Sequence, residues 1–252
     1  MTPVFGNISQ KRGQFRIPEI FLRYHAAVDI QGKFVITSEL LSSIPNVVHG
    51  FGTEAQLVPH VLQPVWEARP QKTQVHGTRA VRIEVERQRA GEADAFHTQK
   101  QGIPVSIITA DCVPLLLARR DGGHVAAVHA GWRGLVDGII PGVLADLGGG
   151  TDWVAAIGPT ICAACYEVSE ELAQQFARRF DGIPAAELLP RPRHLNLRAV
   201  AHEQLRQAGV AAIDHVGGCT CCARDAAGNR LFRSYRRGDR NSQQHAGLYI
   251  AS

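Results

Sequence analysis

The sequence predicts one domain of the α+β or mixed α/β class, and three observations favour it. The chain has 252 residues, which is enough to bury one sizeable core. Short segments with the two-residue alternation or the β-branched composition of strands recur along it. Segments with helical spacing lie between some of these strands, so helices and strands are expected to share one domain.

The strands are predicted in chain order from their apolar patterns. Residues 15–36 hold short alternating apolar stretches, which predict one or two strands, and a strand and loop follow from Val47. Residues 81–85 alternate as Val-Arg-Ile-Glu-Val, which is typical of a half-buried strand. Further short apolar segments predict strands at residues 104–110, 113–118, 125–129, 154–157 and 213–216.

Helical spacing is found in three segments, at residues 135–147, 169–180 and 197–208. A turn at residues 131–134 is expected to precede the first of them. In the second, Leu172, Phe176 and Phe180 recur at i, i+4 and i+8 and form one apolar face. Ser169 is expected to cap the start of that helix with its hydroxyl.

Composition and charge exclude several classes of protein. The net charge of +4 is spread over both signs, so no clustered basic face predicts a nucleic acid partner. No apolar stretch approaches the ~18 residues of a membrane span, and residues 1–12 lack the apolar region of a signal peptide. Six cysteines are too sparse for a disulfide scaffold, so reduced thiols in a cytoplasmic protein are expected.

Three segments each place one possible metal ligand where an apolar strand gives way to a turn. They are the stretches QVHG with His76, TADCVP with Cys112 and VHAGWRG with His129. Imidazole and thiolate are the ligands that zinc prefers, and a catalytic zinc uses three protein ligands with the fourth position open. Separations of 36 and 17 residues match no local zinc motif. From spacing alone, a structural histidine and a buried cysteine are the more common interpretation.

The stretches QVHG, EADAF, TADCVPLLLA, AAVHAGWRGL, IGPTICAACYEV, CTCC and SYRR resemble the laccase-domain purine nucleoside phosphorylase family. This family is also known as the bacterial polyphenol oxidase or peptidoglycan editing factor family. The resemblance runs from about residue 47 to residue 237, and it is densest over residues 74–134. It implies that His76, Cys112 and His129 are zinc ligands.

The resemblance also implies a fold, a reaction and partners. The fold is a single domain over residues 1–252, with mixed β-sheets in a sandwich flanked by helices and residues 1–45 as an N-terminal extension packed on it. The implied activities are phosphorolysis of adenosine, inosine, guanosine and methylthioadenosine, and deamination of adenosine. The expected partners are therefore a purine nucleoside and phosphate, without nucleic acid or membrane, and a monomer is favoured.

Four residues are candidates for catalysis or substrate binding. Cys112 is expected to act in catalysis as a ligand, and Gln74 to contact substrate. Arg133 can bind phosphate through its bidentate guanidinium, or can be a surface arginine. Asp111 can act as a general base, orient a ligand imidazole or cap a turn, and the second of these roles is favoured.

The other five cysteines require a separate interpretation; they are Cys162, Cys165, Cys219, Cys221 and Cys222. They contain two Cys-x-x-Cys pairs, but 53 residues lie between the pairs, far more than the ~15–20 of compact zinc ribbons. Buried thiols near the substrate pocket are expected, with a second metal as the alternative.

Glu54 marks a departure from the family. Family members commonly carry an arginine at this place, after the His-Gly-Phe segment, and a longer stretch before the QVHG motif. Here the segment reads His49-Gly50-Phe51-Gly52-Thr53-Glu54. The wall of the substrate site is therefore expected to be remodelled.

Three other functions are compatible with the sequence. Cys112 and His129 could form the nucleophile and base of a cysteine hydrolase that acts on an amide such as a peptidoglycan precursor. A copper phenol oxidase is less favoured, because laccase-type centres need many histidines and this triad has two. A metal-binding remnant without activity is the fourth interpretation.

Overall fold

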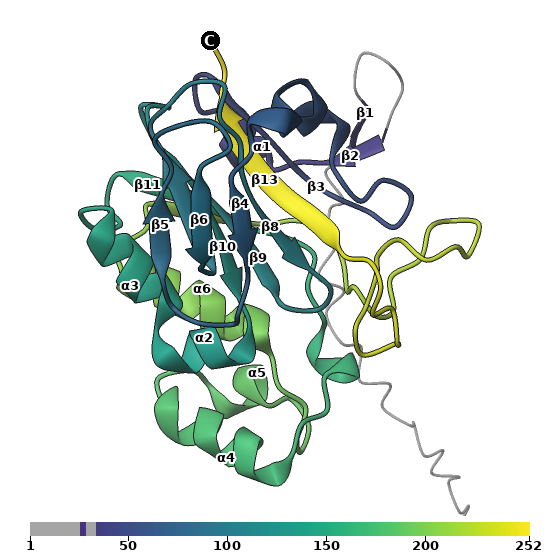
Figure 1. Cartoon of the computed structure of the whole chain (residues 1–252). Coiled ribbons are helices and arrows are strands. Elements are labelled where there is room, and N and C mark those ends of the chain that lie inside the picture. The colour runs from purple at the N-terminus through teal and green to yellow at the C-terminus, as the bar shows by residue number, and fades with distance from the viewer. Residues whose placement is uncertain (1–25, 29–33) are drawn as a thin grey trace, which may run out of the picture.

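The computed structural model describes residues 26–28 and 34–252, and it is built in layers (Figure 1). Two β-sheets pack face to face, and helices cover the outer face of the second sheet. The expected fold class, an α+β arrangement with mixed sheets in a sandwich flanked by helices, is confirmed.

The first sheet has five antiparallel strands in the order β1-β2-β3-β13-β8. Its C-terminal strand therefore lies between two strands from earlier parts of the chain. The strands are β1 (Ala26–Val28), β2 (Phe34–Ile36), β3 (Val47–Phe51), β13 (Gln244–Ile250) and β8 (Val105–Thr109).

The second sheet has six strands in the order β12-β11-β9-β10-β7-β5, and it is mixed. Its outer pairs, β12 with β11 and β5 with β7, are parallel, whereas the inner pairs are antiparallel. The strands are β12 (Ala212–His215), β11 (Trp153–Ile157), β9 (Val113–Arg119), β10 (Val125–Ala130), β7 (Ala95–Thr98) and β5 (Ala80–Arg82). A separate parallel pair joins β4 (Gln71–Thr73) to β6 (Arg89–Glu92).

Strands β9 and β10 are buried on both faces because they lie in the middle layer. Alternate side chains point to opposite faces of a strand. Leu116 and Ala127 therefore join the core between the sheets, whereas Leu115 and Val128 join the core beneath the helices. This double burial explains why the two segments read as continuous apolar runs.

The helices confirm most of the sequence predictions. Ser169 caps α4 (Glu170–Arg179) by accepting a hydrogen bond from the backbone N–H of Leu172, at 3.3 Å. The remaining helices are α1 (Glu39–Ser42), α2 (Trp132–Asp137), α3 (Ile139–Asp146), α5 (Ala185–Leu188) and α6 (Leu197–Gln207), with 3₁₀ helices at η1 (His60–Ala68) and η2 (Ala163–Cys165). Within the described ranges, none of these helices combines the length and apolarity needed to cross a membrane.

Two element predictions are wrong in detail. Residues 131–134 were predicted to be a turn, with one helix over residues 135–147, but the helix starts at Trp132 and breaks at Gly138. Gly138 has a φ of 85°, a left-handed conformation that ends α2 and that glycine adopts without strain. The strand predicted at residues 81–85 is shorter than expected, since β5 ends at Arg82.

The structure describes only part of the N-terminal segment in which strands are predicted. Strands β1 and β2 pair within the segment where one or two strands are predicted. The rest of the expected N-terminal extension, residues 1–25 and 29–33, lies outside the described residues. Within the described part, Ser38 donates its hydroxyl to Asp214 at 2.7 Å and its backbone N–H to His49 Nε2 at 2.8 Å, and the extension over residues 1–45 stays a prediction.

Candidate functional site

The three predicted metal ligands meet at one edge of the sandwich. His76 lies in the loop after β4, Cys112 between β8 and β9, and His129 near the end of β10. Their ligand atoms all lie within 4.8 Å of one another. The two imidazole rings stand edge to face, with centroids 4.7 Å apart and planes inclined by 79°. Segments that are far apart in the sequence therefore present three donors to a common point.

A buried carboxylate, Asp94, fixes the loop that carries His76. It accepts backbone hydrogen bonds from Val75 at 3.1 Å, His76 at 3.0 Å and Gly77 at 2.7 Å. His76 itself has a φ of 62°, a conformation that is uncommon for a residue with a side chain. The three hydrogen bonds hold the loop in this strained shape, which turns the imidazole toward the other two ligands.

Asp94 also orients the second imidazole. His129 donates its Nδ1–H to Asp94 Oδ1 at 2.7 Å, so Nε2 is the ring nitrogen that remains to bind a metal. Asp94, and not Asp111 as favoured from the sequence, is therefore the carboxylate that orients His129. The signal was present in the EADAF stretch, but sequence alone does not show that its aspartate reaches two segments.

Gly131 leaves room for the three ligands. A Cβ atom at this position would lie 2.9 Å from His76 Cδ2 and 3.2 Å from Cys112 Sγ. These separations are shorter than ordinary carbon and sulfur contacts, so any side chain would displace at least one ligand. The glycine of the HAGWRG stretch is thus required by the close approach of the site to the backbone.

Electrostatics within the site favour a thiolate beside a protonated imidazole. Burial opposes ionisation of the Cys112 thiol, but the neighbouring His129 and His76 outweigh it and lower the pKa of Cys112 to about 6. Burial likewise opposes protonation of His129, but Cys112 and Asp94 raise the pKa of His129 to about 9. A cation is therefore favoured between these groups, and a metal ion would replace the proton.

Asp111 has a structural set of partners. Its buried carboxylate accepts a hydrogen bond from the hydroxyl of Thr220 at 2.6 Å and one from the backbone N–H of Arg236 at 2.7 Å. Its carbonyl accepts from the Thr160 hydroxyl at 2.7 Å. Asp111 thus connects the loop of Cys112 to two other segments, one of which carries the SYRR stretch.

The ligands lie in a cleft of about 520 Å³. Its walls carry aromatic and cationic side chains that suit a planar, anionic ligand. The Arg133 guanidinium lies 4.5 Å from the ring centre of Trp132, and that of Arg236 lies 5.1 Å from the ring centre of Tyr166. The other lining residues are Gln74, His76, Ile108, Thr109, Ala110, Asp111, Cys112, His129, Tyr235 and Gln243.

Sequence analysis assigned several of these residues differently. Arg236, Tyr166, Tyr235 and Gln243 line the cleft, although none of the four was singled out as a site residue from the sequence. Gln74 lines the cleft as expected. Its amide, however, pairs with the backbone of Ile108 through two hydrogen bonds of 2.7 and 2.8 Å, as a neighbouring strand would. Substrate binding by Gln74 remains a prediction.

Comparison with known proteins supports the same family as the motifs. Residues 60–251 match the multi-copper polyphenol oxidoreductase laccase family. This chain belongs to that laccase family. The match covers every residue of the cleft described above.

Its relatives in the laccase family carry enzyme names. The chain is 36% identical over 183 residues to a purine nucleoside phosphorylase of Xylella fastidiosa, with 69% of each chain covered. It is 33% identical over 180 residues to adenosine deaminase RL5 from an unknown prokaryotic organism, covering 68% of this chain and 67% of that one. Among solved structures, YlmD from Geobacillus stearothermophilus shares the fold, with a TM-score of 0.71, 22% identity and 90% and 99% coverage.

The donor set of the laccase-family site fits a divalent metal. Two imidazoles and one thiolate converge, Asp94 orients one imidazole, and Gly131 leaves the space they need. Three protein ligands beside a cleft match the arrangement of a catalytic zinc, which keeps a position open for water or substrate. Mixed nitrogen and sulfur ligands also bind copper, so the donor set alone leaves the metal open.

Glu54, where the resemblance leads us to expect an arginine, is not among the residues that line the cleft. Its carboxylate lies 3.5 Å from Arg233 Nη1 and 3.9 Å from Arg237 Nη2. Arg237 in turn pairs with Asp239 at 2.6 Å. Glu54 thus pairs with the segment that carries Tyr235 and Arg236, and the remodelled cleft wall stays a prediction.

The remaining cysteines are not the uniformly buried thiols that the sequence predicted. Four of them gather at one place, with sulfurs within 4.8 Å of one another, and they are Cys162, Cys165, Cys219 and Cys222. Three of the four are half-buried and Cys222 is exposed. The fifth, Cys221, lies outside this tetracysteine cluster.

Proposed function

We propose that this protein is a zinc-dependent purine nucleoside phosphorylase of the cytoplasm that also deaminates adenosine and cleaves methylthioadenosine with phosphate. The observation that supports it best is the convergence of His76, Cys112 and His129 in the lining of a cleft of about 520 Å³. A cleft of this size suits a nucleoside. Relatives named purine nucleoside phosphorylase and adenosine deaminase point to the same substrates.

The cleft walls would hold the two parts of the substrate. A guanidinium lies on one face of each of the Tyr166 and Tyr235 rings, and the other face would stack a purine base. Tyr235 is 58% exposed and lines the cleft. Arg133 and Arg236 are the cations that would bind phosphate, because guanidinium matches phosphate oxygens in a bidentate way. Both arginines lie on aromatic rings, which orient them toward the cleft.

His76, Cys112 and His129 would hold the metal ion. When bound, zinc supplies a Lewis acid that lowers the pKa of water to roughly 7. Asp94 keeps the Nδ1 proton of His129 in place, so that Nε2 remains a ligand. Asp111 positions the Cys112 loop through Thr220 and the Arg236 backbone. Its carboxylate belongs to the acidic residue among the described cleft-lining residues, and it would accept a proton in deamination.

Product analysis with adenosine tests this function. Adenine is expected only when phosphate is present, and inosine is expected with or without it. His76→Ala should lower both rates more than 100-fold and remove the metal of this site. His194→Ala is the matched control, since its Nδ1 contacts the carbonyl of Pro192 and it is not among the residues that line the cleft. The proposal would be refuted if metal-loaded protein formed neither adenine nor inosine.

One observation favours a second candidate, a cysteine hydrolase. Cys112, His129 and Asp94 form the nucleophile, base and orienting carboxylate that such an enzyme requires, and the lowered pKa of Cys112 supplies a thiolate. The two functions differ in their response to a chelator. Metal removal abolishes the zinc reaction, whereas the hydrolase would survive it and lose activity on alkylation of Cys112. The copper phenol oxidase is the least supported alternative, because only two histidines converge within the described site.

A further inference from the structure

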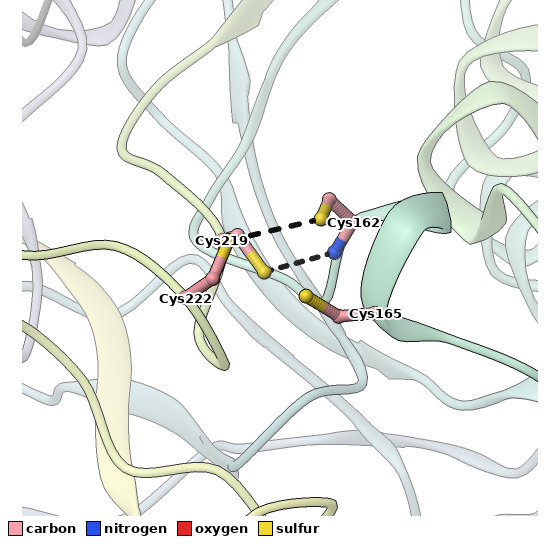
Figure 2. Close-up of side chains that lie close together, drawn as sticks. All are labelled: Cys162, Cys165, Cys219 and Cys222. Atoms are coloured by element: carbon pink, nitrogen blue, oxygen red, sulfur yellow. Dashed lines mark hydrogen bonds between the residues drawn. The ribbon is translucent and has the colours of Figure 1, made fainter.

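We propose that the tetracysteine cluster, Cys162, Cys165, Cys219 and Cys222, binds a second metal ion, a structural zinc held by four thiolates. This site is separate from the cleft. Its ligands come from the segment after β11 and from the segment between β12 and β13 (Figure 2). The proposal is independent of the reaction that the cleft catalyses.

The distances between the sulfurs match a tetrathiolate metal site. Zinc–sulfur bonds of ~2.3 Å in a tetrahedron place the sulfurs about 3.8 Å apart. Here the sulfurs of Cys162 and Cys222 are 4.0 Å apart, and all four lie within 4.8 Å of one another. A disulfide would require about 2.05 Å. The four cysteines are free, so their spacing fits a shared ion better than paired sulfurs.

The backbone turns at both Cys-x-x-Cys pairs, with a hydrogen bond that spans three residues at the first and four at the second. The N–H of Cys165 donates to the carbonyl of Cys162 at 3.0 Å, and that of Ala223 donates to the carbonyl of Cys219 at 3.0 Å. Each turn brings the two cysteines of a Cys-x-x-Cys pair to one side. A parallel bridge between Thr160 and Cys219 then joins the two turns. The 53 residues between the pairs therefore do not keep them apart.

A backbone hydrogen bond to sulfur also supports a ligand role. The N–H of Cys162 donates to Cys219 Sγ at 3.2 Å, as the dashed line in Figure 2 shows. Such a bond stabilises the thiolate form, and groups around metal sites commonly make it to orient a ligand. Figure 2 shows side chains from both turns directed toward a common centre.

The chemistry of the site indicates zinc. Four sulfur donors in a tetrahedron select zinc or iron, and soft thiolates exclude magnesium and calcium. An iron–sulfur cluster places several of its own atoms between the cysteines, and sulfurs this close together leave space for a single ion. Four protein ligands close the coordination sphere, which is typical of structural rather than catalytic zinc. Cys222 is exposed, so an ion can enter from solvent.

The second ion would brace one wall of the cleft. Cys165 precedes Tyr166, and its carbonyl accepts a hydrogen bond from Arg236 Nη1 at 3.4 Å. The Arg236 guanidinium in turn lies on the Tyr166 ring. A metal that joins Cys162 and Cys165 to Cys219 and Cys222 would therefore fix the position of Tyr166 relative to the chain that leads to Arg236.

Metal content and X-ray absorption test the proposal. Two zinc ions per chain are expected in the wild type, and one in Cys219→Ser/Cys222→Ser. Cys221→Ser is the matched control and should keep two, because this cysteine lies outside the cluster. In His76→Ala/Cys112→Ser, which lacks the cleft site, the remaining zinc should have four sulfur neighbours at ~2.3 Å.

The outcomes separate this site from the proposed function. Should the cleft bind no metal, the wild type would hold one zinc that survives His76→Ala/Cys112→Ser and is lost with the cluster. The tetracysteine proposal is overturned if Cys219→Ser/Cys222→Ser keeps the wild-type zinc content. It is also overturned if reduced, zinc-treated wild type shows no zinc with four sulfurs, or iron in its place. The wild-type spectrum requires no substitution: it should show about 2.5 sulfurs per zinc, the mean of four and one.

Discussion

The cleft site and the tetracysteine cluster contrast in how they gather ligands. The cleft draws three donors from three distant segments, whereas the cluster draws four from two tight turns. The cleft depends on residues that are not ligands, namely Asp94 and Gly131. The cluster is formed by the cysteines and their own backbone. An open site that keeps room for a substrate thus depends on supporting residues, and a closed site depends mainly on its ligands.

Replacing Asp94 should have the largest effect on the cleft site and leave the tetracysteine cluster unchanged. The Asp94 carboxylate accepts four hydrogen bonds, three from the backbone and one from His129. In Asp94→Asn, the amide NH₂ group is itself a donor, so at least one of these hydrogen bonds would be lost. We expect a 10–100-fold loss of zinc affinity in the cleft, with a parallel loss of activity. Zinc titration against a competing chelator measures it.

Asp121→Asn provides the control for this substitution. Asp121 is an exposed carboxylate whose pairing with Arg119 should contribute little, so its loss should leave zinc affinity unchanged. The zinc of the tetracysteine cluster should remain in both variants. Wild-type affinity in Asp94→Asn would show that the cleft site does not need its supporting carboxylate.

Gly131→Ala should weaken the cleft site by a smaller factor. The new methyl group would lie 2.9 Å from His76 and 3.2 Å from Cys112, so the ligands must move by several tenths of an ångström. We expect about a tenfold loss of zinc affinity, because His76 is exposed and can yield. Gly142→Ala is the control, since a Cβ there meets nothing within 4 Å. Equal zinc affinity in Gly131→Ala and Gly142→Ala would argue that the ligands do not need the space that Gly131 leaves.

The smallest effect concerns the pH dependence of Cys112 in chelator-treated protein. Its pKa is lowered to about 6, so the thiolate is present above that pH and is lost as the pH falls through it. The rate of alkylation by iodoacetamide, followed for the Cys112 peptide by mass spectrometry, should be half-maximal near pH 6. His129→Ala should shift this midpoint upward, because the main attraction is removed while burial remains. If the wild-type protein instead showed a midpoint near the ordinary pKa of a cysteine thiol, that result would contradict the ion pair between Cys112 and His129.

Much of the fold could be predicted because its signals are local. The central strands follow from apolar runs, and the Ser169 cap follows from one side chain and one helix. The break at Gly138 could not be read with certainty, because a glycine inside a helical pattern is compatible with either outcome. The position of β13 between β3 and β8 depends on pairing between distant segments, which no local pattern encodes.

The site shows the same division. The ligands His76, Cys112 and His129 could be named from motifs that resemble a family. Asp94 was missed because its role depends on reaching both the His76 loop and His129, 18 and 35 residues away. Arg236 was missed for a similar reason, since its place in the cleft depends on a hydrogen bond from its backbone to Asp111 across 125 residues.

The central position of β13 has a consequence for biosynthesis. Strand β8, which leads into the Cys112 loop, has β13 as its neighbour in the first sheet. A ribosome must therefore release the chain through residue 250 before β8 has its full partner strand, and long-range pairing of this kind slows folding. A nascent chain halted before residue 244 would carry all the cleft ligands and still lack the strand that seats one of them.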